Sequence, residues 1–110
     1  MATRIIDLPK SEWRARCLTD ANKCGELNLH FQMLEDDGED VDAMPVARIL
    51  KEARYALEFF EDSGTASDEC ERGDRQALRE RCEMQRFVAK WSKLHADRVA
   101  LLAARAAAAN

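Results

Sequence analysis

The chain has few of the residues that interrupt helices or build aromatic cores. Its 110 residues include two prolines, four glycines, two tryptophans, one tyrosine and four phenylalanines. It has no run of the roughly 20 apolar residues that a bilayer-spanning helix needs, and its first residues lack the apolar stretch of a secretory signal. We therefore expect a soluble, cytoplasmic protein of one domain over residues 1–110, with no membrane partner.

The motifs of common enzymes are also missing. We find no glycine-rich phosphate loop and no nucleophile elbow, and neither His30 nor His95 lies beside a recognisable nucleophile. The acidic segment does not fit a calcium loop: counted from Asp36, the position that needs glycine is Val41 and the position that needs glutamate is Ala47. We therefore predict that the protein is not an enzyme and has no catalytic residue, no metal ligand and no cofactor.

The four cysteines are spaced unlike a zinc or disulfide framework. Cys17 and Cys24 are seven residues apart, which places them about 10 Å apart along a continuous helix, too far for one zinc ion or one disulfide. Cys70 and Cys82 are twelve residues apart. We predict thiols that fill the core, with Cys70 the most exposed because it lies near a helix start. A thiol–metal protein is the third alternative for function.

Apolar residues recur every three or four positions, which predicts an all-α bundle of three helices. We expect the helices at about 9–34, 44–62 and 67–108, with an acidic loop at 35–42 and a linker at 63–67. Pro9 and Pro45 suit first helical turns, and Ser67 suits an N-cap. A fourth helix results if Gly25 or Gly73 breaks one of the three, because glycine costs about 1 kcal/mol in a helix interior.

The predicted C-terminal helix is the most informative element. Its roughly 40 residues would span about 60 Å, whereas a domain of this size is about 25–30 Å across. Its apolar stripe therefore predicts a second chain, and we expect a homodimer. The residues predicted to contact the partner or second copy are Trp91, Leu94, His95, Val99, Leu101 and Leu102.

Charge is distributed unevenly along the chain. Residues 1–65 have 8 basic and 14 acidic side chains, a net charge of −6, and residues 66–110 have 9 and 7, a net charge of +2. Two surfaces of single sign are candidates for contact. The acidic contact loop comprises Glu35, Asp36, Asp37, Glu39, Asp40 and Asp42, and the basic stripe comprises Arg72, Arg75, Arg79, Arg86, Lys90 and Lys93.

These features predict a small helical module that binds another protein, as an adaptor, an assembly factor or an inhibitor that occludes a larger protein. The alternative is a nucleic-acid-associated accessory protein that places the basic stripe along phosphates. Against that alternative stand Asp74, Glu80 and Glu83 on the same predicted helix, and a sequence pI near 5.2. The acidic contact loop and the basic stripe are the two alternative charged surfaces for contact with the partner protein.

Overall fold

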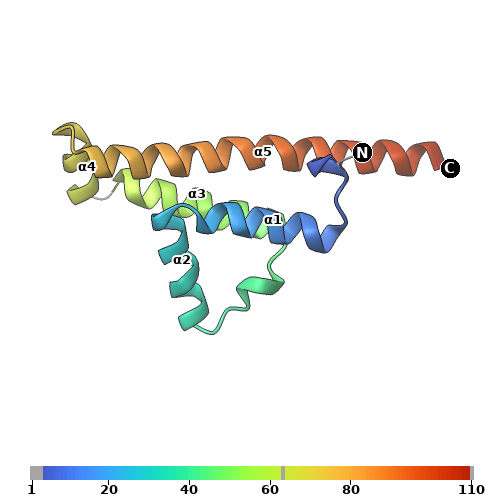
Figure 1. Cartoon of the computed structure of the whole chain (residues 1–110), viewed down its shortest axis with the longest axis horizontal. Helices are drawn as coiled ribbons and strands as arrows, with labels where there is room; N and C mark the ends of the chain where they lie inside the picture. Colours follow the sequence, from blue (N-terminus) through green and yellow to red (C-terminus); the bar gives the residue numbers. More distant parts are fainter. Residues whose placement is uncertain (1–3, 63, 110) are drawn as a thin grey trace.

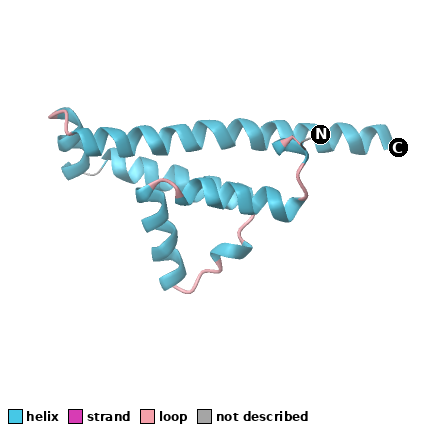
Figure 2. Cartoon of the chain, in the orientation of Figure 1, coloured by secondary structure: helices cyan, strands magenta, loops and turns pink. Residues whose placement is uncertain are grey.

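The computed structural model describes residues 4–62 and 64–109, which form helices and, within those ranges, no strand (Figure 2). Five α-helices follow in order, with single turns of 3-10 helix at Ile5–Asp7 (η1) and Val41–Ala43 (η2). They are α1 (Lys10–Asn22), α2 (Gly25–Asp36), α3 (Val46–Asp62), α4 (Gly64–Glu71) and α5 (Arg75–Ala109). The predicted all-α bundle is confirmed, with more helices than the three expected. Within these residues, no helix has the length and apolar character needed to cross a membrane.

Helix α5 runs along the long axis of the molecule, which measures 55 × 30 × 26 Å (Figure 1). Helices α1 and α3 lie along α5, and α4 folds back against α3 and α5 at one end. Helix α2 projects away from α5, and η2 leads the chain back to the start of α3. The last turns of α5 extend beyond the rest of the chain.

The predicted helix over 9–34 is divided in two, which corrects that prediction. Helix α1 ends at Asn22, and Cys24 is extended, with φ −88° and ψ 121°, before α2 begins at Gly25. The turn changes the chain direction, so that Trp13 and Ala21 of α1 and Leu27 and Phe31 of α2 all reach one core. Helix α2 then continues through Glu35 and Asp36, into the segment predicted to be loop.

The predicted helix over 67–108 is also divided, at Gly73. This residue has φ +78°, a left-handed conformation that glycine adopts without steric cost. The amide of Gly73 donates to the carbonyl of Cys70 and that of Asp74 to Glu69, the hydrogen bonds of a Schellman helix end. The Asp74 carboxylate then caps α5 by accepting the Ala77 amide at 2.9 Å. The segment predicted as a linker over 63–67 is helical from Gly64 onward, where it forms the start of α4. Residue 63 lies outside the described residues.

A second helix end of the same kind lies within the segment predicted as the acidic loop. Gly38 has φ +93°, and the amides of Gly38 and Glu39 donate to Glu35 and Leu34. The chain then forms η2, in which Val41 is buried, and α3 begins at Val46, two residues later than predicted.

One core fills the space among the helices. Its largest fully buried side chains are Trp91, Phe31, Leu27, Ile49, Leu50, Met84 and Cys17. Helix α5 contributes Ala77, Met84, Phe87 and Trp91, so its apolar stripe is covered by its own chain from Ala77 to Trp91. Over this length α5 does not need a second copy to bury its apolar side chains.

Candidate functional site

The predicted partner interface on α5 is only partly available on the surface. Trp91 is fully buried and packs edge-on against Trp13, with ring centroids 4.9 Å apart. The Trp91 side chain is not accessible to a second chain, so the prediction that it is an interface residue is wrong. Leu94, His95 and Leu101 are half-buried, whereas Val99 and Leu102 are 54 % and 49 % exposed. Pairing of two copies through α5 stays a prediction.

Asp20, which the sequence did not single out, holds Trp91 in place. Its Oδ2 accepts hydrogen bonds from Trp91 Nε1 and from Lys90 Nζ, both at 2.9 Å, and Lys23 Nζ lies 3.5 Å from Oδ1. Burial alone would raise the pKa of the Asp20 carboxyl. The hydrogen bonds from Lys90 and Trp91 outweigh this effect, so the pKa lies below its ordinary value. Lys90 and Trp91 are 70 and 71 positions from Asp20 along the chain, and no local spacing rule could have found these contacts.

Both predicted charged surfaces are exposed. All six carboxylates of the acidic contact loop point away from the core, and Glu39 lies 3.6 Å from Arg48. All six residues of the basic stripe are exposed along α4–α5, and Lys90 is held by Asp20. Within the described part of the chain, no residue of either surface is a large apolar side chain or lines the two grooves described below.

The cysteines divide into two kinds. Cys17 and Cys24 are buried, as predicted, and burial raises the pKa of the Cys17 thiol to about 12 and also raises that of Cys24. Cys82 is exposed and Cys70 is half-buried, which corrects the expectation that all four are core thiols and that Cys70 is the most exposed. In residues 4–62 and 64–109, no three His, Cys, Asp or Glu side chains gather as metal ligands would.

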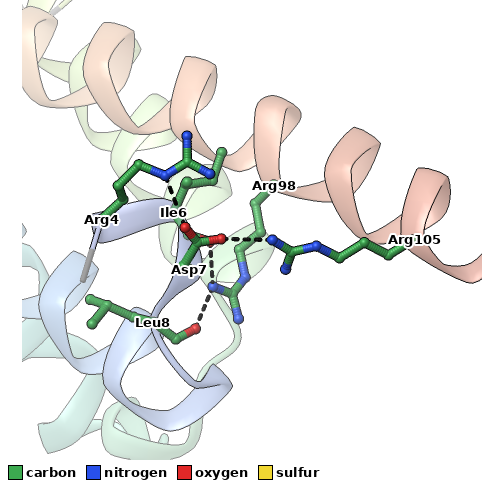
Figure 3. Close-up of polar contacts among 6 residues, drawn as sticks. All are labelled: Arg4, Ile6, Asp7, Leu8, Arg98 and Arg105. Atoms are coloured by element: carbon green, nitrogen blue, oxygen red, sulfur yellow. Dashed lines mark hydrogen bonds and ion pairs between the residues drawn. The ribbon is translucent and has the colours of Figure 1, made fainter. Parts of the chain in front are cut away.

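Three arginines connect η1 and its flanking residues to the last third of α5 (Figure 3). We call this arrangement, made by Arg4, Arg98 and Arg105, the arginine clamp. Arg98 of α5 donates through Nη1 to the carbonyls of Ile6 at 3.0 Å and of Leu8 at 2.5 Å. Arg105 and Arg4 bind the two carboxylate oxygens of Asp7, each at 2.9 Å. Hydrogen bonds from Arg105 and Arg4 lower the pKa of Asp7. The clamp fixes η1 against the last third of α5.

A groove of about 530 Å³ between α2, α3, α4 and α5 gathers most of the exposed large apolar side chains. Four of them lie along it and are 52–68 % exposed. Three glutamates contribute to its wall. We call this the acidic groove; it is lined by Glu26, Leu29, His30, Met33, Tyr55, Ala56, Phe59, Phe60, Glu69, Glu80 and Met84.

The acidic groove has negative charge that its own residues do not neutralise. Burial raises the pKa of Glu26, and the nearby Glu80 carboxylate raises it further, since two like charges oppose each other's ionisation. His30 Nε2 is buried with no hydrogen-bond partner, and it lies 3.9 Å from Glu52 Oε1. Glu80 accepts a hydrogen bond from Gln76 Nε2 at 3.2 Å, but none of the three glutamates of the groove forms an ion pair within the described residues. The groove thus combines an apolar floor with acidic groups that no basic side chain neutralises, at positions that the sequence did not mark as a site.

We compared the chain with known proteins. Comparison with protein families, with curated proteins and with solved structures finds no match to this chain. The interpretation of function therefore rests on the surface chemistry of the chain itself.

Proposed function

We propose that this chain is a non-enzymatic protein-binding module, an adaptor, an assembly factor or an inhibitor, that receives an amphipathic helix of a partner protein in the acidic groove. The observation that carries the proposal is the exposure of four large apolar side chains around this one groove. Contiguous exposed apolar surface rimmed by polar groups is characteristic of protein interaction sites. The acidic groove replaces the α5 surface as the favoured contact.

The lining of the acidic groove suits a helix. Amphipathic helices bind by laying an apolar face into a hydrophobic groove between other helices. Met33 contributes a flexible, polarisable side chain that adapts to a partner's shape, and Phe59 and Tyr55 contribute rigid aromatic area of the kind that dominates binding energy. Tyr55 also lies beside His30, with ring centroids 6.1 Å apart.

The acidic side chains of the groove predict a positively charged partner segment. Glu26 of α2 and Glu80 of α5 lie close enough to raise the pKa of Glu26, and Glu69 of α4 lines the same groove. A lysine or arginine at the edge of a docked helix would relieve this repulsion and gain a charge-assisted hydrogen bond. The partner segment is therefore apolar on one face and basic beside it.

The test uses a fluorescent helical peptide of leucine and lysine, about 18 residues long, as the probe. We expect fluorescence anisotropy to show binding, and Phe59→Asp to weaken it about tenfold, equivalent to roughly 1.4 kcal/mol. The substitution adds negative charge, so attraction through net charge alone would make binding tighter. Ala104→Asp adds the same charge on the exposed end of α5 and serves as the matched control.

The two variants separate the groove from general electrostatics. The proposal requires that Phe59→Asp loses affinity while Ala104→Asp retains it and both keep the circular dichroism of the parent protein. Equal or tighter binding by Phe59→Asp would show that the acidic groove is not the site.

A further inference from the structure

A second groove, of about 790 Å³, lies on α5 near the arginine clamp. It is formed where the first turns of α1 and α3 meet the later part of α5. Two of its apolar side chains, Val99 and Leu102, are half exposed. We call this the basic groove; it is lined by Lys10, Ser11, Trp13, Arg14, Pro45, Val46, Ala47, His95, Arg98, Val99 and Leu102.

The charged side chains around the basic groove are all of one sign. Lys10, Arg14 and Arg98 line it, and none of its lining residues in the described part of the chain is acidic. Arg98 donates to two backbone carbonyls, which are neutral acceptors, so its positive charge is retained. The guanidinium of Arg98 also lies over the Trp13 ring, 4.7 Å from the centroid, which places this charge at the apolar floor of the groove.

Arg14 brings a guanidinium whose hydrogen bonding is incomplete to the wall of the basic groove. Its Nη1 atom is buried and has no hydrogen-bond partner among the described residues. Arg14 as a whole is half-buried and lines the groove, and a carboxylate is the acceptor that matches a guanidinium best. The same groove is reached by the first turns of both α1 and α3, whose free amides and helix dipoles also favour negative charge.

We infer that the basic groove is a second docking site, for a partner segment that presents aspartate or glutamate beside apolar side chains. Charge complementarity with Lys10, Arg14 and Arg98 argues for the carboxylates, and the exposed Val99 and Leu102 argue for the apolar side chains. This inference does not depend on the acidic groove, which lies on other surfaces and requires the opposite charge. With both sites the module would hold two segments of opposite charge at once.

The experiment measures anisotropy of a fluorescent leucine–glutamate helical peptide of about 18 residues. We expect Arg14→Gln to weaken binding about tenfold, because it removes the charge and most of the donors facing the carboxylate. We expect Val99→Lys to weaken it as well, since apolar contact is lost even though positive charge increases. Ala104→Lys, which adds the same charge away from the groove, should keep the affinity, and Phe59→Asp should leave it unchanged.

Several results would overturn the inference. Tighter binding by Val99→Lys would mean that the peptide responds to net charge and not to the groove. Binding of laurate, one molecule per chain, without binding of the peptide would assign the groove to a small amphiphilic acid. Light scattering that shows a dimer of the parent protein and a monomer of Arg14→Gln would assign it to a second copy. Because Phe59→Asp acts only on the acidic groove, failure of one site is distinguishable from failure of the other.

Discussion

At the scale of single residues, Asp20 is the polar side chain that most strongly organises the core. It lies half-buried at the end of α1 and receives hydrogen bonds from two consecutive residues of α5. Trp91 is thereby fixed at both ends, by the carboxylate at its indole nitrogen and by Trp13 at its ring. Loss of Asp20 would leave a buried indole donor without an acceptor.

Replacement of Asp20 should destabilise the protein in a pH-dependent way. We expect Asp20→Ala to lower the free energy of unfolding by about 1.5–3 kcal/mol, the range for hydrogen bonds to a charged group. Because the pKa of Asp20 is lowered in the folded state, its contribution is fully present above about pH 4 and is lost as the pH falls through the folded-state pKa.

Asn at position 20 is the matched control, since its amide oxygen can still accept from Trp91. Urea unfolding at about pH 7 and about pH 3, followed by tryptophan fluorescence, should show a smaller loss of stability on acidification for Asp20→Asn than for the parent protein. Equal losses would contradict the assigned role of the carboxylate charge.

Cysteine reactivity should follow burial. Cys82 is exposed and should react with Ellman's reagent in the native protein, whereas Cys17, buried and with a pKa of about 12, should react only after unfolding, because the thiolate is the reactive form. Cys82→Ser should remove the fastest phase of labelling. Rapid native labelling of Cys17 or Cys24, identified by mass spectrometry, would contradict their burial in the core.

At the scale of elements, two glycines in left-handed conformations decide where helices end. Gly38 and Gly73 both close Schellman ends, whereas Gly25, which the sequence marked as a possible break, is the first residue of α2 and has no positive φ. The break between α1 and α2 instead occurs at Cys24, where the chain turns because both helices face one core. The spacing of apolar residues in the sequence could not distinguish a glycine that ends a helix from a glycine that begins one.

The glycines give a matched pair of substitutions. Gly73→Ala should cost about 1–2 kcal/mol, because an alanine in the left-handed region clashes with its own backbone. At Gly25 no atom lies within 4 Å of an added Cβ, and Gly25→Ala should be neutral or stabilise by up to about 1 kcal/mol through a less flexible unfolded chain. Urea unfolding measures both, and the opposite order of stabilities would refute the assignment of Gly73 as the helix end.

At the scale of the whole molecule, charge is distributed over separate surfaces of opposite sign. The acidic groove lies between α2, α3, α4 and α5, whereas the basic groove lies where the first turns of α1 and α3 meet the later part of α5. Because the basic stripe is exposed, its binding to nucleic acid can be tested directly, although carboxylates on the same helix would repel phosphates. Among its residues, Lys90 is already paired with Asp20.

We expect the protein to bind mixed-sequence DNA and RNA weakly or not at all at physiological salt. If six phosphates were engaged, affinity would fall by about a thousandfold or more between about 50 and 200 mM salt. Anisotropy titrations with duplex and single strands over that range provide the measurement. Low-micromolar binding that disappears in the double variant Arg79→Glu, Arg86→Glu would replace the protein-binding proposal by the nucleic-acid alternative.

The helical class and the approximate location of the long helical segments could be predicted from the sequence, although two of the three predicted helices are divided. Three- and four-residue spacing of apolar side chains predicted all the long helical segments, because that periodicity places them on one face of a helix. The exposure of the acidic loop and the basic stripe was equally predictable, since unpaired charges stay in water.

Which apolar residues are covered, and where the grooves lie, depends on how the helices pack. Trp91 looks like an interface residue on an isolated helix, but it is buried because Trp13 and Asp20 arrive from another helix. Phe59 belongs to the apolar stripe of the segment that forms α3, yet its side chain remains exposed, and α2, which lines the same groove, projects away from α5 (Figure 1). Burial depends on the angles between helices, which are set by contacts between residues far apart in the chain and not by any local pattern.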